Sequence, residues 1–179
     1  KNAAIKADVF ITISDEMRKE YKKRFGKDSI NIFNITENLK IEPFTKTQRD
    51  DLILIYAGGL HFKRWKTLQD LAFAIRRFNI KHNRAVKLKI FSHQDLKEKV
   101  IKLLEVTNAS EFCGALDSDG IRNALNDADI LVHVESFDRK CIESTRFSIS
   151  TKISEYLSVG AKIIAIGPRD VSSMRFLKE

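Results

Sequence analysis

Two short segments of the sequence combine small or hydroxyl-bearing residues with cations, a combination that can bind a phosphate group. In the first segment, Gly58 and Gly59 follow an apolar run and precede Lys63 and Arg64. Glycines let backbone amides approach a ligand closely, and cations at a helix start add positive charge, so this loop could hold a diphosphate. A tight turn beside ordinary surface cations is the alternative, because a glycine pair alone is a weak signal.

The second segment places hydroxyls and an ammonium group just before a predicted helix. Ser148, Ser150, Thr151 and Lys152 stand there, so their polar groups would converge at the positive end of the helix. A Ser/Thr N-cap would explain one hydroxyl, but not three hydroxyls together with a lysine. We therefore favour an anion site over a plain cap.

Metal ligands are not expected from the acidic residues or the histidines. Asp117 and Asp119 form an Asp-x-Asp pattern that can bind a metal–nucleotide pair, but Asp127 and Asp129 form it too, so the pattern is unspecific. Asp117 is better explained as a helix N-cap. His133 lies in an apolar strand near its end, where a core or rim histidine is favoured over a ligand.

Apolar runs alternate with helical periodicities along the chain. Strands are predicted at 52–57, 86–91, 111–114, 130–134 and 162–166, with amphipathic helices between them and a polar loop before the helix that follows Phe147. Strands that are apolar on both faces and alternate with helices predict an α/β fold with a doubly wound parallel sheet. Because such sheets bind ligands at the carboxyl ends of their strands, the loops 58–64, 112–117 and 135–152 form the candidate site.

Positive charge is concentrated in the middle of the chain. The net charge is +8, and residues 60–106 contain 12 basic and 4 acidic residues. A basic stripe fits phosphate, an anionic membrane surface or nucleic acid. The cations lack the interleaved aromatics of single-strand binders, so no nucleic-acid partner is expected. With neither a secretory leader nor a disulfide framework recognisable, we expect a cytoplasmic protein, and we keep peripheral contact with the inner face of the cell membrane as a further expectation.

Three motifs follow one another in a recognisable order and spacing. They are Ile55-Tyr-Ala-Gly-Gly-Leu60 with Arg64, Ala128-Asp-Ile-Leu-Val-His-Val-Glu135, and Phe147-Ser-Ile-Ser-Thr-Lys-Ile-Ser-Glu-Tyr-Leu-Ser-Val-Gly160 with Ile163-Ile-Ala-Ile-Gly-Pro168. In this order they resemble the nucleotide-sugar-binding half of a GT-B-fold, group 1 retaining glycosyltransferase. The resemblance implies that residues 1–36 are a strand–helix–strand remnant of the N-terminal acceptor domain. It also implies a linker at 37–50 and a donor-binding domain at 51–179 that is truncated at its C-terminus.

The resemblance also implies roles for individual residues at the donor site. Arg64 and Glu135 would be catalytic, with Arg64 meeting the diphosphate and Glu135 holding the donor sugar. The remaining donor-binding residues would be Gly58, Gly59, Phe112, Cys113, Ser150, Thr151, Lys152 and Glu155. Of these, Glu155 would hold the ribose hydroxyls, Phe112 and Cys113 would read the base through their backbone, and the others would face the phosphates.

A literal search for two acids with seven residues between them selects Glu135 with Glu143 instead of Glu155. Glu143 stands among cations without apolar periodicity, so we expect it to be a solvated loop acid. Glu155 begins a helix that ends in glycine just before a strand, which is the context that the family's second acid has. The loop between Glu135 and Glu155 is longer than the family pattern has.

The activity implied is transfer of a sugar from a nucleotide diphosphate sugar, a UDP-sugar by class frequency, to a polysaccharide or lipid-linked acceptor. No cofactor and no metal are implied. A GT-B sugar-nucleotide epimerase and a non-catalytic nucleotide-binding or membrane-surface module remain as alternatives. Because most of the acceptor domain is missing from the pattern, the chain alone is expected to be inactive.

Overall fold

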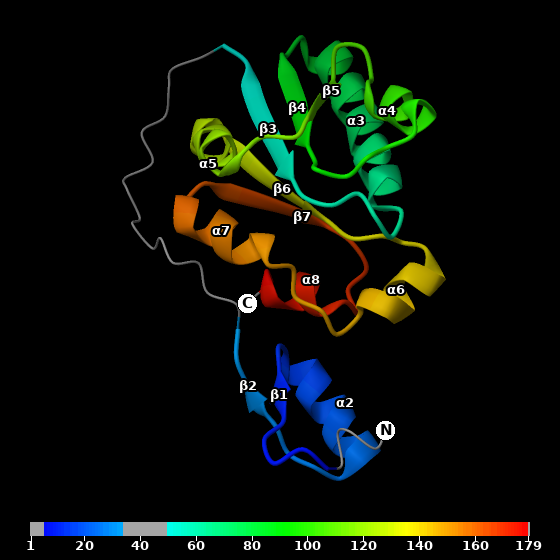
Figure 1. Ribbon diagram of the computed structural model, residues 1–179. Helices are drawn as coiled ribbons and strands as arrows, with labels where there is room; N and C mark the ends of the chain where they lie inside the picture. The colour runs from blue at the N-terminus through cyan, green and yellow to red at the C-terminus, as the bar shows by residue number, and fades with distance from the viewer. Residues whose placement is uncertain (1–5, 34–49, 179) are drawn as a thin grey trace.

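The computed structural model describes residues 6–33 and 50–178, so the predicted linker at 37–50 lies outside the described residues except for Asp50. The described chain forms a small two-stranded sheet and a five-stranded sheet, both parallel (Figure 1). Its elements in chain order are β1 (Ile11–Thr12), α2 (Asp15–Phe25), β2 (Ile30–Asn31), β3 (Leu52–Ala57), α3 (Arg64–His82), β4 (Val86–Phe91), α4 (Glu98–Leu104), β5 (Ser110–Gly114), α5 (Ser118–Asp127), β6 (Ile130–Val134), α6 (Arg139–Thr145), α7 (Lys152–Val159), β7 (Lys162–Ile166) and α8 (Ser172–Phe176).

The large sheet has the strand order β5-β4-β3-β6-β7, which confirms the predicted doubly wound arrangement. The chain first builds outward from the central strand β3 to the edge strand β5. It then crosses back to add β6 and β7 on the other side of β3. The direction of winding therefore reverses between β3 and β6, and open α/β sheets bind ligands at the carboxyl ends of the strands at such a reversal.

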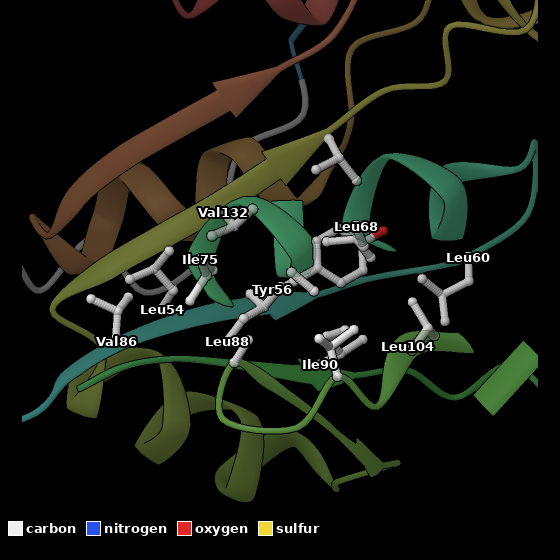
Figure 2. Close-up of a cluster of buried hydrophobic side chains, with 14 residues drawn as sticks. Leu54, Tyr56, Leu60, Leu68, Ile75, Val86, Leu88, Ile90, Leu104 and Val132 are labelled. Atoms are coloured by element: carbon white, nitrogen blue, oxygen red, sulfur yellow. The ribbon is translucent and has the colours of Figure 1, made fainter. Parts of the chain in front are cut away.

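Alternate residues of β3 serve two separate hydrophobic cores, because successive side chains of a strand point to opposite faces of the sheet. Leu54 and Tyr56 pack in the core that α3 and α4 cover, together with Leu68 and Leu104 (Figure 2). Ile53, Ile55 and Ala57 pack instead in the core that α5 and α7 cover, which includes Leu125 and Tyr156. A strand that is buried on both faces needs helices on both faces, which is the layering seen in Figure 1.

The Tyr156 side chain fixes α7 to the end of β3. The residue is 1% exposed, and its hydroxyl accepts a hydrogen bond from the Ala57 amide at 2.9 Å and donates one to the Ala57 carbonyl oxygen at 3.3 Å. Burial raises the pKa of the Tyr156 phenol, so the group stays neutral. The carboxyl end of β3 and the helix that follows the long loop are thereby held in register.

The N-terminal segment forms the predicted strand–helix–strand unit, with strands of two residues each. Ser14 caps α2 by accepting a hydrogen bond from the Met17 amide, and Gly26 ends the helix with a φ of 69°, a conformation that glycine adopts without strain. β1 and β2 pair in parallel through Ile11 and Ile30.

The expectation of a polar loop up to Phe147 is wrong, because residues 139–145 form α6. Asp138 caps this helix by accepting a hydrogen bond from the Cys141 amide at 3.3 Å. Cys141 and Thr145, one turn apart, are its buried face, and two residues are too short a pattern to reveal a helix in the sequence. Glu143 lies exposed on α6, and its Oε1 is 3.4 Å from Arg139 Nε. The prediction that Glu143 is solvated is therefore confirmed, but the prediction that it lies in a loop is wrong.

The short helix α8 was also not expected from the sequence. Within the part of the chain that the structure describes, no helix has the length and apolar character needed to cross a bilayer.

Candidate functional site

The glycine loop after β3 is closed by hydrogen bonds that the protein makes with itself. The Gly58 amide donates to the Phe91 carbonyl oxygen at 3.1 Å, and the Leu60 amide donates to Gln94 Oε1 at 2.8 Å. The Tyr56 hydroxyl donates to the Gly59 carbonyl oxygen at 2.7 Å. The expectation that the amides of both glycines face a phosphate is therefore not met at Gly58, whose amide extends the sheet.

Gly59 lets the loop backbone lie close against the exposed side chain of His61. A Cβ atom at position 59 would lie 2.5 Å from the ring of His61, which would have to turn away, and one at position 58 would lie 3.0 Å from the Tyr56 hydroxyl. Both glycines therefore bring the backbone close to neighbouring side chains beside the candidate site.

Arg64 and Glu135 meet at the switch point between β3 and β6. Arg64 is the first residue of α3, and Glu135 directly follows β6. The guanidinium Nη2 lies 3.0 Å from both carboxylate oxygens, and Nε lies 3.2 Å from Oε2. The Glu135 side chain is 2% exposed and that of Arg64 is 13% exposed. Thr67 Oγ1, one turn along α3, donates to the Glu135 carbonyl oxygen at 2.9 Å and fixes the end of β6 to the helix.

Two histidines flank this ion pair. His61 Nε2 lies 3.4 Å from Arg64 Nη1 on the exposed side of the pair. His133 is buried, and its Nε2 lies 3.4 Å from Glu135 Oε1 without hydrogen-bond geometry to any described residue. The burial of His133 agrees with the interpretation as a core or rim histidine. That interpretation would also require hydrogen bonds to the ring nitrogens, and Nε2 has no such partner among the described residues.

The electrostatics of the cluster keep Glu135 ionised. Burial would raise the pKa of its carboxyl, but the nearby imidazole of His133 and the guanidinium of Arg64 lower it by more, so the pKa lies below its ordinary value. Burial and the positive charge of Arg64 together lower the pKa of His61. The site therefore holds one fixed carboxylate and one fixed guanidinium at neutral pH.

A second ion pair, between Lys63 and Asp138, was not predicted from the sequence. Lys63 Nζ lies 2.6 Å from Asp138 Oδ2, and this contact joins the start of α3 to the start of α6. The hydrogen bond from Lys63 and the one from the Cys141 amide lower the pKa of Asp138 to about 2. Because Asp138 caps a helix that sequence periodicity did not reveal, the pairing had no signal in the sequence.

The polar groups at the start of α7 do not converge on one point in the way that the sequence suggested. Lys152 Nζ turns to Glu155 in the same helix, at 2.9 and 2.7 Å from its two carboxylate oxygens, so the ammonium group is paired with the predicted ribose ligand. Thr151 occupies the N-cap position with a helical backbone and makes no side-chain capping bond. The hydroxyl of Ser154 donates to the Thr151 carbonyl oxygen at 2.7 Å.

Buried serines hold the segment that leads into α7, and sequence reasoning missed them. Ser173 Oγ on α8 accepts from the Ser150 amide at 3.2 Å and donates to the Ser148 carbonyl oxygen at 3.1 Å. Ser14 Oγ, from the N-terminal unit, donates to the Phe147 carbonyl oxygen at 2.7 Å. Ser172 and Ser173 are at most 1% exposed. Serine at a buried position without apolar periodicity carries no sequence signal, so these contacts were not predictable.

Phe112 and Cys113 lie at the carboxyl end of β5, which is two strands away from β3 in the sheet. The Ser92 amide of the neighbouring strand segment donates to the Gly114 carbonyl oxygen at 2.8 Å. Strand spacing puts them about 10 Å from β3. Burial and the nearby Glu111 raise the pKa of the Cys113 thiol to about 11, so the thiol is neutral.

One member of each acidic pair singled out in the sequence has a structural role. Asp117 accepts from the Gly120 amide at 2.8 Å and caps α5, as predicted. Asp129 Oδ2 accepts from the Ile53 amide at 2.8 Å, which joins the start of β6 to β3. Among residues 6–33 and 50–178, no three His, Cys, Asp or Glu side chains are arranged to hold a metal ion.

Solved structures of two glycosyltransferases share this architecture. Staphylococcus aureus TarM aligns over 91% of this chain with 19% sequence identity and a TM-score of 0.65, and a TarM variant crystallised with Fondaparinux, α-GlcNAc-glycerol and UDP gives 17% identity at the same TM-score. The pneumococcal O-GlcNAc transferase GtfA, in complex with UDP and GlcNAc, aligns over 90% of the chain with 15% identity and a TM-score of 0.54.

The fold is that of one half of a GT-B enzyme. The chain spans 30% of the length of each of these structures. No protein-family model and no curated protein sequence matches the chain. At these identities the GT-B likeness concerns the backbone arrangement, so the roles of individual residues have to be argued from the site itself.

Proposed function

We propose that this chain is the donor-binding half of a glycosyltransferase that uses a UDP-sugar and transfers the sugar to a polysaccharide or lipid-linked acceptor. The observation that carries the proposal is the partly exposed guanidinium of Arg64, fixed at the switch point between β3 and β6. Nucleotides bind open α/β sheets at this place, and arginine pairs well with phosphate. The GT-B fold, and the UDP present in structures of TarM and GtfA, support the choice of nucleotide.

Arg64 is suited to stabilise a leaving diphosphate. Its Nε and Nη2 are held by Glu135, so the direction of the guanidinium is set, while Nη1 points toward His61 at the exposed side and keeps donors for a phosphate. A cation that is oriented in advance needs no reorganisation as negative charge develops on the leaving group. In this arrangement Glu135 orients Arg64, and any contact of Glu135 with the donor sugar would be made with this pair intact.

The other donor contacts are proposed on α7 and β5. The amides of Thr151 and Lys152 would meet the diphosphate, Glu155 would accept from the ribose hydroxyls, and the backbone at Phe112 and Cys113 would read the base. Lys152 and Glu155 pair with each other, so both would exchange this contact for contacts with the donor. Residues 51–179 would form the donor domain and residues 1–36 part of the acceptor domain, so we expect binding without transfer by this chain alone.

Thermal unfolding with a panel of nucleotides tests the proposal. A ligand that binds only the folded state raises the melting temperature, so UDP and UDP-sugars should raise it more than uridine or inorganic diphosphate do. No shift with any nucleoside diphosphate would contradict the proposal. Product analysis with a complete chain that includes the acceptor domain separates the alternative, because an epimerase of this fold would release free sugar.

A further inference from the structure

The outer face of α3 combines protruding apolar side chains with cations. Phe73 is 45% exposed and Ile80 is 75% exposed, and both lie on the side of the helix opposite Leu68 and the core. They are seven residues apart, so they project from the same side two turns from each other. Exposed cations surround them at positions Lys66, Arg76, Arg77, Lys81 and Arg84.

These cations are not neutralised by the residues around them. Within 6–33 and 50–178, the ion pairs on α3 and the adjacent α4 involve Arg64 and Lys102 instead. Asp70 is the acid on this side of α3, and it lines an open depression together with Phe73, Arg76 and Arg77. The helix dipole favours a cation in the last turn, such as Lys81, but not Arg76 and Arg77 in mid-helix. Arg77 and Lys81 also repel each other at i,i+4 spacing. An external anion would offset this repulsion.

We propose that this face of α3, defined by Lys66, Phe73, Arg76, Arg77 and Ile80 and called the α3 face below, docks on an anionic lipid surface. Cations spread along a helix suit an extended layer of anionic headgroups, and flanking apolar side chains can enter the boundary between headgroups and acyl chains. A nucleic acid fits less well, because single-strand binders stack successive bases on several aromatic rings, whereas Phe73 is the one aromatic residue among the five that define this face.

The α3 face is separate from the candidate donor site and does not depend on the proposed function. Arg64 occupies the first residue of α3, whereas Arg76 and Arg77 lie three turns further along the helix. Substitutions at Arg76 and Arg77 should therefore leave nucleotide binding unchanged.

Co-sedimentation of the full chain with lipid vesicles tests the proposal. Vesicles of phosphatidylcholine alone are compared with vesicles of equal parts phosphatidylcholine and phosphatidylglycerol. We expect stronger binding to the mixed vesicles, reduced at least about tenfold by the double substitution Arg76→Glu/Arg77→Glu, since each basic residue near an anionic surface contributes measurably to binding. The matched control is Lys19→Glu/Lys23→Glu on α2, which changes the net charge equally and should stay within about twofold of wild type.

A second variant tests the apolar contribution. Phe73→Ser/Ile80→Ser keeps every charge and should remove the binding that remains at about 1 M salt, where electrostatic attraction is screened within about 3 Å. Both residues are exposed, so the fold should survive, and unchanged melting temperatures would confirm this. Three outcomes would overturn the proposal: no preference for anionic vesicles, an equal loss in the α2 control, or displacement from vesicles by a soluble polyanion that binds the α3 face more tightly.

Discussion

Arg64 Nη2 lies 3.0 Å from each carboxylate oxygen of Glu135, across the switch point of the large sheet. This contact joins the first residue of α3 to the residue that follows β6, and both side chains are largely withdrawn from water. A buried ion pair gains little over an apolar pair of the same shape, but loss of one partner leaves the other charge uncompensated. The pair therefore affects both the stability of the fold and the direction of the guanidinium.

Replacing Arg64 should destabilise the protein unless Glu135 is neutralised as well. We expect Arg64→Met to lower the free energy of unfolding by about 3 kcal/mol, because the Glu135 carboxylate is then buried without its cation. The double variant Arg64→Met/Glu135→Gln should recover part of this loss. Urea unfolding of Arg64→Met, Glu135→Gln and the double variant measures the coupling energy between the two residues. Strictly additive losses of unfolding free energy would contradict the buried pair.

Acid should weaken the fold through Glu135. Its folded-state pKa lies below the ordinary value of 4.5, so the stability it contributes is complete above that value and is lost as the pH falls through the folded pKa. Unfolding free energies measured between about pH 6 and about pH 3 should fall more steeply for wild type than for Glu135→Gln, which cannot titrate. Equal slopes would mean that the carboxyl titrates alike in the folded and unfolded chains.

The layering of the fold could be predicted from the sequence because strands such as 52–57 and 130–134 are continuous apolar runs between amphipathic helices. The placement of Arg64 at the start of α3 followed from the same pattern. What periodicity could not reveal was α6, whose buried face is only Cys141 and Thr145, and α8, whose buried serines look like solvent-exposed residues. The pairing of Lys63 with Asp138 depends on α6, so this ion pair could not be predicted either.

The contact between Arg64 and Glu135 also could not be deduced from sequence, although both residues were singled out. They stand 71 positions apart, and each had a separate predicted ligand. Their meeting depends on β6 lying next to β3, and the alternation of strands and helices does not by itself fix the order of the strands. The hydrogen bond from Thr67 to the backbone of Glu135 also depends on β6 lying next to β3, so it could not be deduced either.

The two candidate second acids should respond differently to substitution. A carboxylate that accepts two ribose hydroxyls makes charge-assisted hydrogen bonds, so Glu155→Ala should lower UDP affinity by on the order of tenfold or more. Glu143→Ala should bind UDP like wild type, because Glu143 lies exposed on α6 and faces Arg139. Calorimetric titration of both variants checks this, and a loss confined to Glu143→Ala would contradict the assignment of Glu155.

The buried hydroxyl of Ser173 should matter for the start of α7. Ser173→Ala leaves the Ser150 amide and the Ser148 carbonyl without this partner, at a cost of about 1–3 kcal/mol in unfolding free energy. UDP affinity should fall too, because the segment before α7 loses its support. Ser144→Ala is the matched control, since its hydroxyl is exposed and bonds only within α6. Equal stabilities for the two variants would contradict the role given to Ser173.

Calorimetric titration of the chain with UDP and with uridine tests the central claim, the assignment of Arg64 to the diphosphate, most directly. Wild type should bind UDP more tightly than uridine, and Arg64→Ala should weaken UDP binding by on the order of tenfold or more while changing uridine binding little, because only UDP carries the charge that arginine meets. Arg76→Ala/Arg77→Ala, further along the same helix, should leave both affinities unchanged. Equal losses for UDP and uridine in Arg64→Ala, in a variant whose melting curve shows it folded, would contradict the account.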